Sequence, residues 1–188
     1  MAISVVKKIH PKKFALWIGL TSIVMFFAAF TSAYIVRKSQ GDWADFALPA
    51  EFFYSTAAII GSSVFLHSAY KAFAAEKLAL FKIFLVSGFL LGITFVVLQY
   101  QGWLSLNEIE IFVYSNQHSS FVFMITGFHV AHVLGGITAL IFALVFAFLP
   151  QYQSVTPRRL LRLEIIFTYW HFVDVLWLYL FIFFMVQQ

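Results

Sequence analysis

Long apolar stretches alternate with short polar segments along the whole chain. Five of the stretches have the length of a membrane-spanning helix, and they cover about residues 14–36, 52–73, 79–103, 119–149 and 164–186. At a rise of about 1.5 Å per residue, roughly 20 apolar residues cross a hydrocarbon core about 30 Å thick. Because backbone polar groups must be paired inside a bilayer, the pattern predicts an all-α integral membrane bundle of five transmembrane helices.

The composition strengthens this interpretation. Hydrophobic residues make up 62% of the chain and charged residues only 11%, which a soluble domain could not carry without exposing large apolar patches. The segments between the stretches are too short to form a soluble domain, so we expect residues 1–188 to be a single membrane domain. Cysteine is absent, which excludes disulfides and thiolate metal sites in this chain.

The distribution of charge predicts the orientation. Ten of the twelve lysines and arginines fall on one side of the predicted membrane: Lys7, Lys8, Lys12, Lys13, Lys71, Lys77, Lys82, Arg158, Arg159 and Arg162. Only Arg37 and Lys38 fall on the other side. By the positive-inside rule the N-terminus lies in the cytoplasm and, after five crossings, the C-terminus lies outside. Because the basic residues lie in short loops, they indicate orientation and no nucleic acid partner is expected.

Four ionisable side chains lie well inside the last two stretches, and they are His129, His132, His171 and Asp174. A spacing of three residues puts each pair on one helix face. A short connection makes the two helices antiparallel neighbours, so we expect the pairs to reach each other. Since an unpaired polar group in hydrocarbon costs several kcal/mol, we favour a structural network in which these side chains hydrogen-bond one another.

Two other interpretations of this cluster stay open at this point. Neutral imidazole is the commonest metal ligand, so the histidines could hold a metal ion or haem and make the chain an electron carrier. Carboxylates and histidines also form proton relays in membrane pumps, although only Glu164 and Asp174 supply carboxylates within the spans. The surrounding Phe, Leu and Trp side chains are bulky for haem, so a structural role is favoured.

Four more residues lie near the ends of the spans: His67, Lys71, Arg162 and Glu164. We expect them to make interfacial or lipid contacts, with Glu164 in a salt bridge near Arg162. Small residues mark two faces for helix packing. Ser55, Ala58 and Ser62 share a face of the second stretch, and Gly88 and Gly92 form a GxxxG pattern in the third, which predicts close approach of neighbouring backbones.

Two longer segments resemble the signature segments of a known family. Residues 126–135 read Thr-Gly-Phe-His-Val-Ala-His-Val-Leu-Gly, and residues 169–177 read Tyr-Trp-His-Phe-Val-Asp-Val-Leu-Trp. Both are similar to segments of subunit III of the haem-copper oxidases, the cytochrome c oxidase type. Two further patterns resemble that family: Ser55-Thr56 with Ser62, and Gly92-Ile93-Thr94-Phe95 with Gln99. From Phe14 onward the chain is similar to the five-helix form of the family.

The resemblance implies a core subunit of a proton-pumping terminal oxidase of aerobic respiration in the bacterial cytoplasmic membrane. It implies a non-catalytic chain without a cofactor or metal of its own, with haem and copper in subunits I and II. It also implies packing on subunit I, phospholipid in a cleft between the first two helices and the other three, and support of stability and proton uptake. A larger respiratory supercomplex is compatible with it. Subunit III of a quinol oxidase and an accessory subunit of a nitric oxide reductase remain alternatives, because their sequences look similar.

Two positions depart from the pattern of the family. Many members carry a glutamate where this chain has Ile23, and another where it has Gly102. No role of those carboxylates is therefore expected here. The resemblance carries over a structural and not a catalytic role for the histidines and the aspartate of the last two stretches.

Overall fold

The computed structural model describes residues 10–41, 43, 46–108, 111–114, 116–150 and 154–187. These residues form five α-helices: α1 (Pro11–Lys38), α2 (Ala50–Ala74), α3 (Leu78–Glu108), α4 (Gln117–Phe148) and α5 (Pro157–Gln187). Each is long and apolar enough to cross a membrane, so the predicted all-α bundle of five membrane helices is confirmed. α5 begins at Pro157 and not near Glu164, so its first two turns carry three arginines of the basic side.

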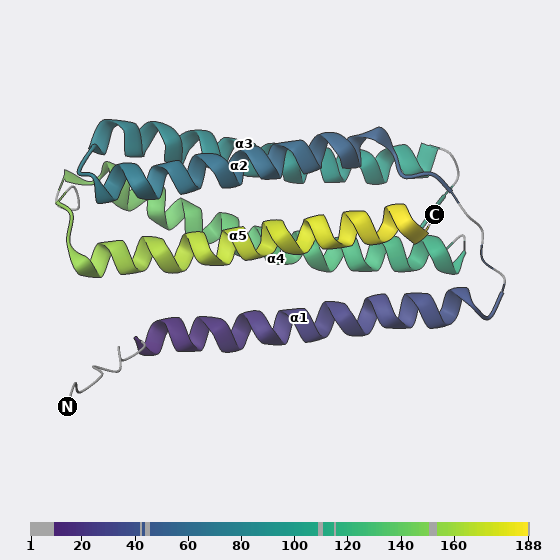
Figure 1. Cartoon of the computed structure of the whole chain (residues 1–188). Helices are drawn as coiled ribbons and strands as arrows, with labels where there is room; N and C mark the ends of the chain where they lie inside the picture. The colour runs from purple at the N-terminus through teal and green to yellow at the C-terminus, as the bar shows by residue number, and fades with distance from the viewer. Residues whose placement is uncertain are drawn as a thin grey trace, which may run out of the picture.

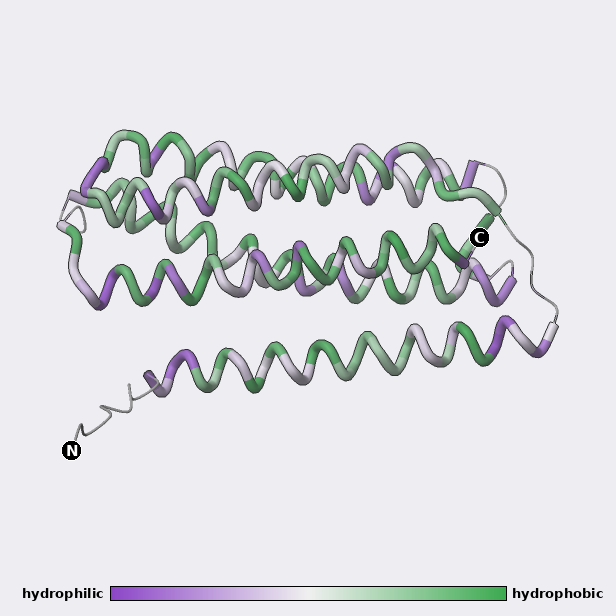
Figure 2. The backbone as a smooth tube through the Cα atoms, viewed as in Figure 1, coloured by the Kyte–Doolittle hydropathy of each residue, from purple (hydrophilic) through white to green (hydrophobic). Residues whose placement is uncertain are grey.

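The helices lie alongside one another with their axes roughly parallel (Figure 1). α2 packs on α3 and α5, α4 packs on α3 and α5, and α1 packs on α4 and α5, on the side of the bundle away from α2 and α3. The start of α1, the turn between α2 and α3, and the connection between α4 and α5 lie at one end, which we call the basic end. Figure 2 shows hydrophilic positions concentrated toward the helix ends and hydrophobic positions along the middles.

Glycines shape the contact of α3 with α2 and with one side chain of α5. A Cβ atom at Gly88 would lie 2.7 Å from Leu66 Cγ of α2, and one at Gly92 would lie 2.6 Å from Trp170 Cη2 of α5. The Ser62 hydroxyl donates a hydrogen bond of 2.7 Å to the Gly88 carbonyl. The close approach predicted from the GxxxG pattern occurs between α3 and α2 at Gly88. Gly92 instead leaves room for the Trp170 side chain of α5, and a side chain at either glycine would clash.

α1 and α2 are consecutive in sequence but pack on other helices. α1 and α2 make no packing contact in the described part of the chain, and each packs on α5 instead. α1 buries one stripe of side chains, formed by Leu20, Phe27, Thr31 and Tyr34. The buried face of α2 has small residues, so α2 can pack closely against the glycines of α3. The buried side chains of α1 are larger and do not allow such close packing. The phospholipid cleft expected between helices 1–2 and helices 3–5 remains a prediction, and among the described residues α2 packs on α3 and α5.

Helix starts follow from local sequence. The Asn116 side chain accepts a 2.8 Å hydrogen bond from the Ser119 backbone N–H, and Ser119 returns a bond to the Asn116 backbone, which forms a capping box at the start of α4. α1 begins with Pro11 directly after His10, a position that suits proline because its missing N–H has no helical acceptor there. These caps fix the register in which α1 and α4 present their faces to the bundle.

Candidate functional site

A polar groove lies between α2 and α5 at the level of His171. The Ser63 hydroxyl of α2 is hydrogen-bonded to His171 Nδ1 and also interacts with the Asp174 carboxylate. The rings of His67 and His171 lie with their centroids 6.0 Å apart. We define the polar groove by its lining residues, which enclose about 340 Å³: Ser63, Val64, His67, Ser68 and His171. His171 and Asp174 thus find their partners on α2.

His129 occupies a different environment, in the centre of the bundle. Its side chain is fully buried, and the aromatic rings of Phe27, Phe95 and Trp177 surround it at centroid distances of 6.4, 5.8 and 5.1 Å. Neither ring nitrogen has a hydrogen-bond partner among the described residues. His129 therefore contributes through ring packing, at the cost of two unpaired polar atoms.

His132 is bonded within its own helix. Its Nδ1 lies 2.7 Å from the Phe128 carbonyl oxygen, and its ring packs on Phe27 with centroids 5.6 Å apart. The Tyr169 hydroxyl of α5 donates a 3.0 Å hydrogen bond to the backbone carbonyl of His132. α4 and α5 are thus joined at this level by a tyrosine and not by the histidine side chains.

Among the described residues, no hydrogen bond joins His129, His132, His171 and Asp174 to one another. His171 bonds to Ser63 and His132 to the Phe128 carbonyl, while the ring nitrogens of His129 have no partner. The reason is the angular spacing of α5: at about 100° per residue, side chains two positions apart point about 200° apart. Tyr169 faces α4, so His171 faces away from α4 and toward α2. The sequence placed the two pairs at one depth but not on facing sides of their helices. Ser63 was missed, although its spacing of four from His67 puts both on one face.

A ladder of buried hydrogen bonds connects the other signature residues. Gln99 Nε2 donates to Ser55 Oγ at 2.8 Å, which links α3 to α2. Trp177 Nε1 donates to Thr56 Oγ1 at 2.9 Å, which links α5 to α2. Trp103 Nε1 donates to Thr126 Oγ1 at 3.1 Å, which links α3 to α4. For the indole N–H groups of Trp103 and Trp177, a threonine hydroxyl of a neighbouring helix is the acceptor.

The departure at Gly102 follows from packing. A Cβ atom there would lie 2.7 Å from Phe52 Cε2, so no longer side chain fits while α2 and α3 keep this distance. Ile23, at the other departure, packs against an apolar cluster that includes Phe27 and Leu180. At both positions the structure has a packing contact where many family members carry a glutamate.

The residues predicted at the membrane boundary have distinct surroundings. Glu164 forms an ion pair, and its partner is Lys13 of α1. Lys71 is exposed on the last turn of α2, and His67 lines the polar groove. Arg162 lines an apolar pocket of about 290 Å³, to which all five helices contribute.

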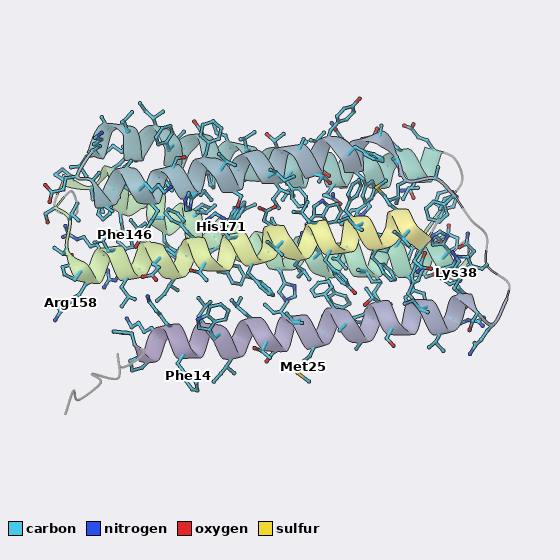
Figure 3. All side chains as sticks on the ribbon, viewed as in Figure 1. Phe14, Met25, Lys38, Phe146, Arg158 and His171 are labelled. Carbon is cyan, nitrogen blue, oxygen red and sulfur yellow. The ribbon has the colours of Figure 1, made fainter. Side chains whose placement is uncertain are left out.

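We call the apolar pocket that Arg162 lines the basic-end pocket. Its rim carries Lys12, Arg159 and Arg162, and its wall is apolar: Phe73, Phe81, Ala143, Phe146, Ala147, Leu163, Ile165 and Ile166. Figure 3 shows Phe146 near the basic end of the bundle. A cationic rim above an apolar wall is complementary to an amphiphilic anion.

No group of three or more His, Asp or Glu side chains arranged to hold a metal ion occurs within the described ranges. The polar groove has two ionisable side chains, His67 and His171. The chemistry that these residues offer is hydrogen bonding between helices and, in the groove, toward a group outside the bundle.

Comparison with known proteins gives a consistent result over the whole bundle. The family model described as Cytochrome c oxidase subunit III matches residues 11–187. The chain is 34% identical over 172 residues to a protein of Corynebacterium diphtheriae named cytochrome c oxidase subunit 3, covering 87% of this chain and 82% of that one. A probable cytochrome c oxidase subunit 3 of Mycobacterium bovis is 31% identical over 171 residues with the same coverage.

A more distant relative matches over a shorter range. The cytochrome c oxidase subunit 3 of Canis lupus is 38% identical over 93 residues, which are 49% of this chain and 33% of that protein. The family match extends from the first turn of α1 to the end of α5 and so includes all five helices. The chain therefore belongs to the cytochrome c oxidase subunit III family, and it is by its family a subunit of a respiratory oxidase complex.

Proposed function

We propose that this chain is the non-catalytic subunit III of a proton-pumping haem-copper terminal oxidase in a bacterial cytoplasmic membrane. It packs on subunit I, while haem and copper are held by subunits I and II. The observation that carries the proposal is the family match over residues 11–187. The charge asymmetry of the loops supports a cytoplasmic basic end, with the C-terminus outside.

In this proposal His129, His132, His171 and Asp174 have structural roles. His129 fills an aromatic cage, and the backbone of His132 accepts the bond from Tyr169 that joins α4 to α5. His171 holds α5 to α2 through its hydrogen bond with Ser63, and Asp174 is buried about one turn further along α5. A bundle joined in this way supplies a rigid surface for the larger subunits and so stabilises them and supports proton uptake.

We propose that phospholipid binds at the basic-end pocket instead of the expected cleft. An acyl chain lies against the apolar wall, and the headgroup phosphate lies at Lys12, Arg159 and Arg162. The cytoplasmic leaflet is rich in anionic lipid, which matches the charge of this rim. Arg162→Gln should lower the amount of anionic phospholipid that co-purifies with the complex, whereas Lys71→Gln should leave it unchanged because Lys71 does not line the pocket.

Affinity purification through a tag on this chain tests the main proposal. A larger haem-containing subunit should co-purify, and the Soret absorbance should follow that subunit when the complex is dissociated. The isolated chain should have no Soret band. A haem retained by this chain alone in equal molar amount would overturn the proposal in favour of an electron carrier.

A further inference from the structure

The polar groove lies at membrane depth. His171 is 14 residues from Pro157 and 16 from Gln187, so at a rise of about 1.5 Å per residue it lies about 21 and 24 Å from the two ends of α5. His67 lies seven residues from the end of α2, about 10 Å along the axis. The groove thus extends from the middle of the bundle toward the basic end, within the part that the hydrocarbon core would surround.

The groove opens outward, on the side of the bundle formed by α2 and α5. Figure 3 shows His171 in the space between these two helices. His67 is exposed, and Val64, which lines the groove with it, is exposed to 61%. Val175, one turn after His171 on α5, is exposed to 62%. We call this surface the α2–α5 face and define it by five residues: Ile60, Val64, His67, His171 and Val175.

The hydrogen bonds of the two imidazoles are incomplete. His171 bonds to Ser63 through Nδ1, and no described residue bonds its Nε2. The ring of His67 makes no hydrogen bond with any described residue, and its ring contact is with His171. Neutral imidazole has one donor and one acceptor, and lipid chains offer partners to neither. Lipid against this face would therefore leave polar atoms unpaired in hydrocarbon.

Other outward faces of the bundle are compatible with lipid. On α3 the Thr94 hydroxyl donates to its own helix at the Leu90 carbonyl, at 3.0 Å. On α4 the Thr138 hydroxyl does the same at the Leu134 carbonyl, at 2.8 Å. The neighbouring Leu90 and Leu134 side chains are exposed to 57% and 49%. These faces are as apolar as the α2–α5 face, but their polar groups are already paired.

We infer that the α2–α5 face is the surface on which a transmembrane helix of the larger, haem-containing subunit docks, with a side chain that hydrogen-bonds His67 and His171. The inference rests on the proposed function and specifies which face of this chain meets the partner. A polar side chain on a protein helix supplies the missing donor or acceptor, and the exposed valines surround it with apolar contact. The α3 and α4 faces remain in contact with lipid.

Photo-crosslinking in native membranes that contain the complete oxidase tests the assignment. A photo-reactive benzoylphenylalanine replaces Val64 or Val175 on the α2–α5 face, and in matched controls it replaces Leu90 on α3 or Leu134 on α4. The first two should crosslink to the larger subunit, identified by mass spectrometry, and the controls should yield lipid adducts. Lipid adducts at all four positions, or crosslinks of this chain to a second copy from Val64 and Val175, would overturn the inference.

Substitution of His67 provides a second measurement. His67→Leu should weaken retention of this chain on the tagged larger subunit roughly fivefold during detergent washing, because the hydrogen bond across the interface is lost. His67→Gln, which keeps a donor and an acceptor, should retain it, and Thr94→Val on the α3 face should have no effect. Since His67 makes no hydrogen bond with the residues that the structure describes, the helical circular dichroism of all variants should match. Equal retention of the His67→Leu and wild-type chains would contradict the inference.

The two proposals fail in distinguishable ways. If the tagged chain brings down no haem-containing subunit, the proposed function fails. If it does bring one down, but the Val64 and Val175 positions react only with lipid, the proposed function stands and the docking face is wrong.

Discussion

α1 and α2 are helices of similar length that join the bundle in different ways. α2 has 25 residues and buries ten of them, whereas α1 has 28 and buries four. α2 approaches α3 closely enough for the Ser62 hydroxyl to hydrogen-bond the Gly88 carbonyl. The bulky Phe27 and Tyr34 side chains of α1 instead lie against α4 and α5. Between helices in lipid the hydrophobic effect contributes little, so close packing and hydrogen bonds decide how tightly a helix is held. By this measure α1 is the weakly held helix.

The largest effect should come from a glycine at the tight contact. Gly92→Leu places a side chain where Trp170 lies 2.6 Å from the site of the Cβ atom, so we expect a loss of about 3 kcal/mol in the free energy of unfolding. Gly19→Leu on α1 is the matched control, because nothing lies within 4 Å of its Cβ position, and it should change stability by no more than about 0.5 kcal/mol. Denaturant unfolding in micelles measures both. Similar losses for the two variants would remove the contrast between α1 and the other helices.

The next effect concerns the hydrogen bond from Trp177 to Thr56. A double-mutant cycle with Trp177→Phe and Thr56→Val should give a coupling of about 1 kcal/mol, a typical value for a hydrogen bond between membrane helices. The Thr56 hydroxyl also donates a 2.7 Å hydrogen bond to the Phe52 carbonyl, so it keeps a partner in the Trp177→Phe variant. Thermal unfolding of the four proteins gives the coupling. Additive losses would show that α2 is held to α5 by packing alone.

The sequence predicted the helices better than it predicted their mutual orientation. Apolar length is a local property, so five helices and the close contact at Gly88 and Gly92 could be predicted from the sequence. Which face of α5 meets which neighbour depends on the rotation of a whole helix, and so the partners of His171 and His129 could not be predicted. The packing of α1 on α4 and α5 could not be predicted for the same reason, since consecutive helices need not be in contact.

A smaller effect is expected at the hydrogen bond between Thr31 of α1 and Tyr179 of α5, whose hydroxyl oxygens lie 2.9 Å apart. Thr31→Val should lower stability by about 0.5 kcal/mol, because the bond is replaced by van der Waals contact. Hydrogen exchange should increase in α1 and remain unchanged in α2, since α1 can separate from the bundle while the close contact between α2 and α3 stays intact. Thr21→Val is the control, because that hydroxyl bonds only to its own helix at the Trp17 carbonyl. Faster exchange in both helices would mean that α1 and α2 open as one unit.

The smallest effect should come from the ion pair between Lys13 of α1 and Glu164 of α5. Both side chains are more than a third exposed, so a double-mutant cycle with Lys13→Gln and Glu164→Gln should give a coupling of about 0.3 kcal/mol that falls as salt is added. Unfolding at low and high ionic strength measures it, with Lys71→Gln as a control for loss of a positive charge at the same end. A coupling that is large and independent of salt would mean that the ion pair is shielded from water, and α1 would then be anchored at its basic end as firmly as α2 is along its length.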